Sequence, residues 1–189
     1  MGVDSSKPGG NLDDTTVVSR VQRGDREAFG ILVTRYQKMV FALAQRMTGS
    51  PEEARDVVQS SFLNAFRQIG NFRGEASFKT WVYGIALNEC RMLYRKSGRT
   101  VAMDSVAEPV APSAGGHALD RLVLGKMVSR LPEKQRSALV LRVCEDLPFR
   151  DIGEILGTSE ASAKVNYFHA VKKLRGWVRP EPDDEGEES

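Results

Sequence analysis

The chain is 189 residues long and carries a formal net charge of +2, with 41% apolar and 28% charged residues. This length predicts one or two domains, and this composition predicts packed domains rather than a disordered chain. No apolar run is long enough to span a membrane and no signal peptide is recognisable, so we expect a cytoplasmic protein without membrane insertion.

Helices dominate the first half of the chain, since no run alternates apolar and polar residues for long enough to form a strand. We expect residues 1–14 to be a disordered tail. Helices are predicted over residues 15–23, 26–47, 51–69 and 78–96. Ser50 as N-cap and Pro51 at the first helical position, followed by two acids, mark the third start clearly. With a loop at residues 70–77, these helices form a first unit over residues 15–96.

The helix over residues 51–69 has one apolar face and one outward polar face. The outward face carries Asp56, Gln59, Ser60, Leu63 and Arg67. Leu63 is the only large apolar member of this set. It is either a stray surface leucine, which is common, or the centre of a protein-docking face. The helix alone does not distinguish the two.

The helix over residues 78–96 mixes aromatic and basic residues. Its predicted buried stripe is Phe78, Trp81, Val82, Ile85, Ala86 and Leu93, and its predicted outward face is Thr80, Tyr83, Leu87, Arg91 and Tyr94. Aromatic and basic side chains together suit stacking on unpaired bases and contact with phosphates, although a solvated face would have the same pattern. The preceding loop adds Phe72 and Arg73 beside glycines that let a backbone approach a ligand closely.

Composition changes after residue 96. Residues 97–118 are rich in Ser, Ala, Pro and Gly and predict a flexible linker. A second helical unit follows over residues 119–178.

The charge of the chain is unevenly distributed. The last ten residues hold six acids and no base, so residues 1–179 carry a net charge of +8. A basic body followed by an acidic tail, which we expect to be disordered over residues 179–189, suits a protein that binds polyanions.

The second unit ends in a helix-turn-helix pattern. Apolar spacing predicts a helix over residues 149–156, Gly157 supplies the turn, and Ser159 is placed to cap a second helix that starts at Glu160. The predicted buried stripe of that second helix is Ala163, Tyr167, Ala170, Leu174 and Val178, and its opposite face is Ala161, Val165, Phe168 and Lys172. Apolar side chains between cations suit a helix that contacts thymine methyl groups, guanine and phosphate in the major groove. The alternative is a second apolar contact inside a larger core.

Three blocks in order resemble the extracytoplasmic-function (ECF) group of bacterial sigma factors. They are DVVQSSFLNAF (56–66), FRGEASFKTWVYGIALN (72–88) and the segment 131–165, which contains LPEKQRSALVLR and LPFRDIGEILGTSEASAKV. The resemblance extends over about residues 15–177. It implies an all-α fold of two small helical domains joined by a linker, the second a helix-turn-helix. It also implies an alternative sigma factor that binds core RNA polymerase, recognises and melts specific promoters and directs transcription initiation.

The resemblance assigns a partner to each unit. The first, similar to sigma region 2, would bind the polymerase clamp and capture the minus-ten element as a melted strand. The second, similar to sigma region 4, would bind the minus-thirty-five element as duplex and touch the polymerase flap. Family members are often held by an anti-sigma factor, so such a partner is expected here too.

The same resemblance, with the face analysis above, gives the candidate residues. The polymerase-binding candidates are Asp56, Gln59, Ser60, Leu63 and Arg67. The minus-ten candidates are Phe72, Arg73, Ser77, Lys79, Tyr83, Asn88, Arg91 and Arg95. The minus-thirty-five candidates are Ser162, Lys164, Val165, Phe168, His169 and Lys172.

No catalytic group is predicted in the chain. It shows no paired carboxylates with a base, no nucleophile and histidine pair, and no phosphate-binding glycine loop. Cys90 and Cys144 have no metal-ligand spacing, so we expect two reduced packing residues and no metal or cofactor. Two other classes remain to be weighed. They are a stand-alone helix-turn-helix regulator that acts without polymerase and a nucleic-acid enzyme with a helical scaffold.

Overall fold

The computed structural model describes residues 12–96 and 124–178, and every regular element within these two ranges is a helix. The predicted all-α class is therefore confirmed. The first unit comprises α1 (Asp14–Gln22), α2 (Phe29–Thr48), α3 (Pro51–Gln68), the short 3₁₀ helix η1 (Ile69–Asn71) and α4 (Phe78–Lys96). The second unit comprises a helical stretch at residues 124–129, α6 (Glu133–Val143), α7 (Phe149–Leu156) and α8 (Glu160–Val178). The predicted linker (97–118), the predicted acidic tail (179–189) and residues 1–11 of the predicted N-terminal tail lie outside the described residues.

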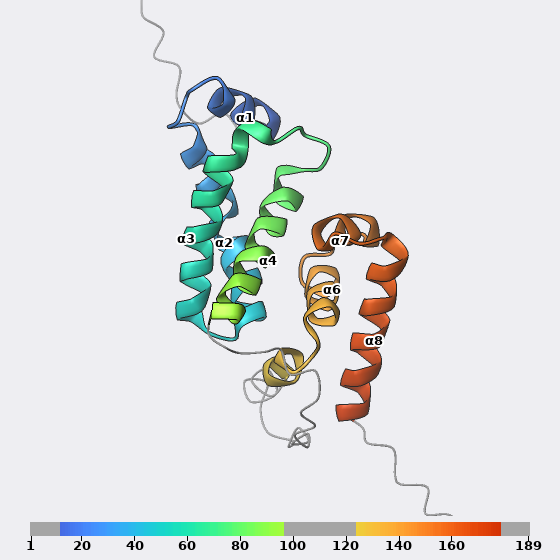
Figure 1. Cartoon of the computed structure of the whole chain (residues 1–189). Coiled ribbons are helices and arrows are strands. Elements are labelled where there is room, and N and C mark those ends of the chain that lie inside the picture. The colour runs from blue at the N-terminus through green and yellow to red at the C-terminus, as the bar shows by residue number, and fades with distance from the viewer. Residues whose placement is uncertain (1–11, 97–123, 179–189) are drawn as a thin grey trace, which may run out of the picture.

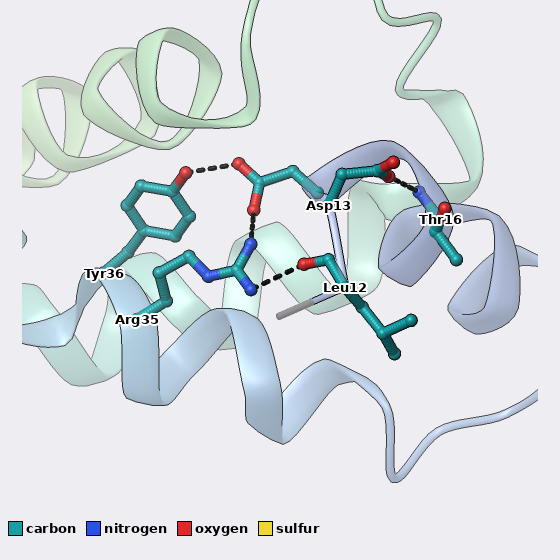
Figure 2. A network of polar contacts seen from close by, with 6 residues as sticks. Leu12, Asp13, Thr16, Arg35 and Tyr36 are labelled. Atoms are coloured by element: carbon teal, nitrogen blue, oxygen red, sulfur yellow. Dashed lines mark hydrogen bonds and ion pairs between the residues drawn. The ribbon is translucent and has the colours of Figure 1, made fainter. Parts of the chain in front are cut away.

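The first helix starts slightly earlier than the sequence predicts, and its start is fixed by polar contacts (Figure 2). Asp13 caps α1, since its carboxylate accepts a hydrogen bond from the Thr16 backbone N–H at 2.6 Å. The Asp14 carboxylate accepts from both the Arg35 guanidinium and the Tyr36 hydroxyl, and Arg35 also donates to the Leu12 carbonyl at 2.7 Å. These contacts place residues 12–14 in the first unit rather than in a disordered tail.

Capping groups at the end of α2 and at the start of α3 fix the boundary between these helices. Gly49 ends α2 in the left-handed conformation, with φ of 75°, and its N–H donates to the Gln45 carbonyl at 2.8 Å. The Ser50 hydroxyl then accepts from the Glu53 backbone N–H at 3.3 Å, and Pro51 occupies the first turn of α3. The predicted helix start at Ser50 is confirmed.

Helices α2, α3 and α4 pack together as the core of the first unit, with α3 and α4 side by side in Figure 1. The buried face of α3 includes Val57 and Ala65, which lie opposite the predicted outward face. The Phe29 ring on α2 packs edge-on against Phe62 and Phe66 of α3, with ring centroids 6.4 and 5.1 Å apart. Such edge-to-face pairs add to the stabilisation from burial alone.

The second unit packs directly against the first (Figure 1), and this contact overturns the predicted faces of α4. Helix α7 lies against α4, and α6 lies against α2. Thr80, Tyr83 and Leu87, predicted to face outward, are all buried, while Trp81, Ile85 and Leu93 of the predicted buried stripe are only half-buried. One continuous apolar core joins Tyr83 and Leu87 to Leu141 and Ile152 of the second unit. Helix α4 therefore has apolar neighbours on two sides, which a single predicted stripe does not describe.

The helix-turn-helix forms as predicted, because two glycines meet the geometry of its turn. Gly157 ends α7 with φ of 62°, a conformation that a residue with a Cβ adopts only with strain. Gly153 lies where a Cβ atom would come within 2.9 Å of the Thr158 carbonyl oxygen and 3.0 Å of the Glu160 backbone nitrogen. These are backbone atoms, so α7 and α8 approach this closely only because residue 153 has no side chain.

We expect Gly153→Ala to lower the melting temperature of the protein, because the added methyl group forces the α7–α8 turn apart. The matched control is Gly84→Ala in the middle of α4, where a Cβ would meet nothing within 4 Å. This control should be neutral or more stable by about 0.5–1 kcal/mol, since alanine is the better helix former. Thermal unfolding followed by circular dichroism compares the two. Equal melting temperatures for Gly153→Ala and the parent would contradict the close approach.

Candidate polymerase and nucleic-acid interfaces

The outward face of α3 is exposed as predicted. Asp56, Gln59, Leu63 and Arg67 are exposed and Ser60 is half-buried. The Leu63 side chain is 51% exposed and packs into no core. Asn64 beside it is held by Glu89 of α4 at 2.6 Å. The five polymerase-binding candidates thus share the outward face of α3.

A groove runs between α3 and α4 next to this surface. Asp56, Ser60, Met92 and Arg95 are among the residues that line it. The groove brings two polymerase-binding candidates together with one minus-ten candidate, Arg95. Met92 is 60% exposed and was not among the predicted residues. One feature of the sequence could have indicated Met92. It is a large apolar residue between two basic residues, Arg91 and Arg95, near the end of a helix.

The loop before α4 contains an aromatic cluster. Phe72 is half-buried, with its ring 5.1 Å from Trp81 and 6.0 Å from Phe78. Ser77 acts as a cap, because its hydroxyl accepts from the Thr80 backbone N–H at 3.0 Å. Arg73 is exposed. The loop thus presents a cation beside the edge of an aromatic cluster rather than a free aromatic side chain.

Tyr83 is the minus-ten candidate whose position differs most from expectation. It is fully buried, and its hydroxyl donates to the Glu145 carboxylate of the second unit at 2.5 Å. Burial, together with this hydrogen bond to an acid, raises the pKa of Tyr83 well above its usual value. Lys79 is half-buried, with its ammonium 5.5 Å from the centre of the Tyr83 ring. In this arrangement Tyr83 cannot stack on a base.

The three candidates nearest the end of α4 are more accessible. Arg91 donates to the Asn88 side-chain oxygen at 2.9 Å and pairs with Glu133 of α6. Asn88 and Arg95 are exposed. Of the minus-ten candidates on α4, the structure thus buries Tyr83, pairs the half-buried Arg91 with the second unit, and leaves Asn88 and Arg95 exposed.

The outward face of α8 is exposed, and the alternative of a buried apolar contact there is wrong. Lys164, Val165, Phe168, His169 and Lys172 are all exposed, with Val165 and Phe168 at 52% each. Ser162 is half-buried and bonds to the capping Ser159, whose hydroxyl also accepts the Ser162 backbone N–H at 3.1 Å.

The opposite face of α8 is buried mainly at Ala163 and Ala170. Tyr167 and Leu174 are half-buried. Val178, which the periodicity places in the buried stripe, is 42% exposed at the end of the helix. The Phe168 ring is supported edge-on by Tyr167 at 5.3 Å. In Figure 1, α8 lies on the far side of the second unit from α4.

Sequence reasoning missed two buried charged residues at the contact between the units. Glu145 follows α6 in a short turn and resembles any loop acid in the sequence, yet its side chain is only 8% exposed. Arg136 is 2% exposed, and its guanidinium carbon lies 5.2 Å from the centre of the Tyr94 ring on α4. No periodicity signals either residue, since both are buried by an element that is distant in sequence.

The two cysteines differ from each other. Cys90 is buried, and burial raises the pKa of its thiol to about 12. Cys144 is exposed, so the expectation that both are packing residues is wrong for Cys144.

Within residues 12–96 and 124–178, no group of His, Cys, Asp and Glu side chains could hold a metal ion. No helix in these ranges is long and apolar enough to cross a membrane.

Each of the two units is similar to a domain of known proteins. Residues 32–100 match Sigma-70 region 2, and residues 121–174 match Sigma-70, region 4. The RNA polymerase sigma-H factor of Pseudomonas aeruginosa is 34% identical over 182 residues, which cover 88% of this chain and 94% of that protein. The ECF RNA polymerase sigma-E factor of Haemophilus influenzae is also 34% identical, over 89% of this chain and 97% of that protein. The chain belongs to the ECF sigma factors.

Two solved structures share the fold of this chain over most of its length. The structure of CnrH in complex with the cytosolic domain of CnrY is 25% identical, with a TM-score of 0.68 over 89% of this chain and 99% of that chain. The sigma factor RpoE in complex with the anti-sigma factor NepR, from Bartonella quintana, has a TM-score of 0.65 over 82% of this chain and 98% of that chain. At 22% identity this second likeness is one of fold.

Proposed function

We propose that this ECF sigma factor binds core RNA polymerase, recognises and melts specific promoters, and directs transcription initiation. The observation that carries the proposal is the presence of both sigma regions, in order, on one chain whose α3 and α8 faces are exposed. A stand-alone helix-turn-helix regulator would need no region 2. Catalysis of RNA synthesis would belong to the polymerase, because the chain's own role is to bind and to position.

The α3 face is the proposed polymerase contact. Leu63 offers an apolar centre surrounded by the polar groups of Asp56, Gln59 and Arg67. An exposed large apolar residue with a polar rim is the usual organisation of a binding hot spot. We infer that the polymerase clamp packs on this face and that its flap contacts the second unit.

The loop before α4, together with the outer part of α4, is the proposed site for the melted minus-ten strand. Arg73 in the loop and Asn88 and Arg95 on α4 are accessible polar groups. Unstacking a base costs a few kcal/mol, and stacking and phosphate contacts on the free strand return about 1–3 kcal/mol per base. The chain would therefore stabilise an open promoter without consuming an energy source.

The α8 face is the proposed site for the minus-thirty-five duplex. Its cations Lys164 and Lys172 flank exposed Val165 and Phe168. Cations suit phosphate and guanine, and apolar groups suit the methyl group of thymine. We also infer an anti-sigma factor as a partner, since the sigma factor RpoE, whose fold is similar, is solved in complex with the anti-sigma factor NepR.

Transcription in vitro tests the proposal directly. Purified core polymerase, a library of genomic fragments and this chain should together give transcripts with defined start sites. Core polymerase alone should give none. If the chain binds DNA fragments but adds no start site, it is a DNA-binding regulator and not an initiation factor.

We expect Leu63→Ala and Asp56→Ala to weaken binding of core polymerase by about 1–2 kcal/mol each, as for central interface residues. Helix content should not change, because neither side chain is buried. The matched control is Glu52→Ala at the exposed start of the same helix. Affinity is measured by fluorescence anisotropy of the labelled chain. Normal binding by both variants would mean that the polymerase contacts another face.

We expect Phe168→Ala and Lys172→Ala to have different effects on duplex binding. Phe168 carries no charge, so its loss should cost about 1–3 kcal/mol at the cognate minus-thirty-five site and little on unrelated DNA. Lys172, as a phosphate contact, should weaken binding to all duplexes equally and reduce the salt dependence by about 0.9 in log–log slope. Lys164, near the start of α8, should behave more like Phe168.

The measurement for these variants is titration of cognate and scrambled duplexes across a salt series. A Phe168→Ala variant that loses affinity equally for both duplexes would contradict a role in base recognition.

A further inference from the structure

We propose that Gln22, at the end of α1, is a positioning residue for the melted minus-ten strand, because its side-chain amide fixes the loop that would hold the strand. This loop, residues 72–77 between η1 and α4, is called the minus-ten loop below. The proposal rests on the proposed function of the loop, and it adds α1 to the parts of the chain on which strand binding depends.

Gln22 joins α1 to the start of the minus-ten loop. Its Nε2 atom donates one hydrogen bond to the Ile69 carbonyl at 2.8 Å and another to the Phe72 carbonyl at 3.0 Å. A primary amide carries two N–H donors on one nitrogen, so a single side chain can satisfy both carbonyls. The Ile69 carbonyl also accepts the Phe72 backbone N–H at 3.1 Å. Gln22 thus bonds to both ends of the η1 turn, from which the loop begins.

The backbone of Gln22 is held in place by its own helix. Val18 and Val21 on α1 are buried in the core of the first unit. Arg20 pairs with Asp25 at 2.7 Å across the turn that follows α1. A side chain on an ordered backbone loses less conformational freedom when it bonds than one on a mobile segment. Helix α1 is therefore the fixed side of this contact, and the loop is the side that is positioned.

The contact sets the direction in which the chain enters the minus-ten loop. The Phe72 carbonyl belongs to the planar trans peptide that links Phe72 to Arg73. Holding its oxygen against α1 turns the Arg73 backbone N–H the opposite way. Arg73 is exposed and is the cation of this loop. The hydrogen bond from Gln22 therefore limits where the Arg73 guanidinium can meet a phosphate group.

Other groups hold the rest of the loop. The Phe72 ring packs against Trp81 and Phe78, with centroids 5.1 and 6.0 Å apart, and Ser77 caps α4. These contacts fix a side chain at one end of the loop and the start of a helix at the other. They do not fix the Phe72 carbonyl. Loss of the Gln22 amide should therefore free the first peptide of the loop without unpacking the aromatic cluster.

Strand binding should gain from a loop that is already ordered. A loop with several conformations must lose that freedom on binding, and apparent affinity falls in proportion to the fraction of chains in the competent conformation. The contribution to folding stability should be small, because Gln22 is exposed and water can replace its hydrogen bonds. Strand affinity and folding stability are thus expected to respond differently to the loss of this side chain.

The test uses Gln22→Met, which removes both donors and keeps an unbranched side chain with similar helix propensity. The matched control is Gln68→Met, the same change just before η1, at an exposed position that makes no side-chain capping bond. Each full chain is assembled with core polymerase. The probe is a promoter from the transcription experiment above, made with mismatches that keep its minus-ten element unpaired.

We expect the Gln22→Met holoenzyme to bind this probe about fivefold less tightly than the Gln68→Met holoenzyme, as for the loss of a hydrogen bond that orders a binding loop. Affinity for core polymerase and the melting temperature of the free chain should match the control. Amide hydrogen exchange over residues 72–77 should be faster. With Arg73→Ala also present, the effect of Gln22→Met on affinity should largely disappear, because the position of Arg73 no longer matters.

Equal affinities of the two holoenzymes for the unpaired probe would overturn the proposal. An effect of the same size with and without Arg73 would also overturn it, as would a lower melting temperature or weaker core binding than the control. Failure of the proposed function has a different signature. The parent holoenzyme would then give no transcripts, whereas exchange over residues 72–77 would still be faster in Gln22→Met.

Discussion

Helix α4 has to be covered on two sides, and the arrangement of the whole molecule follows from this constraint. Its buried residues include Phe78 and Val82 toward the first unit, and Tyr83 and Leu87 in the core shared with α6 and α7. Fully burying a leucine side chain is worth about 1.5–3 kcal/mol relative to exposure. Helices α2 and α3 cannot surround α4 completely, so the remaining apolar side is closed by the second unit.

The contact between the units also contains polar groups. Glu145 accepts hydrogen bonds from Tyr83 and Arg46, and Glu133 pairs with Arg91. A buried carboxylate needs such partners, because burying it unpaired is costly. The second unit therefore closes α4 through both apolar burial and paired charges.

The sequence predicted where the helices begin and end better than it predicted which residues pack against them. The limits of α7 and the start at Ser50 were predictable because capping groups and turn glycines act within a few residues. The exposed faces of α3 and α8 were also predictable, since each of these helices has a single apolar side.

The faces of α4 were not predictable in the same way. Periodicity identifies one stripe, but Tyr83 and Leu87 are buried by residues more than 50 positions later in the chain. The burial of Glu145 was missed for the same reason. Glu145 becomes a buried hydrogen-bond acceptor only through its contact with the first unit, and the residues next to it in sequence do not predict that contact.

The separation of duplex and single-strand recognition between two helices can be tested by site-specific photo-crosslinking in an initiation complex. A benzophenone amino acid replaces Asn88 on α4 in one chain and Phe168 on α8 in another, both exposed positions. With core polymerase and promoter DNA, position 88 should crosslink to the non-template strand near minus ten. Position 168 should crosslink to duplex near minus thirty-five. Crosslinks from both positions to the same DNA segment, or from position 88 only to duplex, would contradict the assignment of one promoter element to each unit.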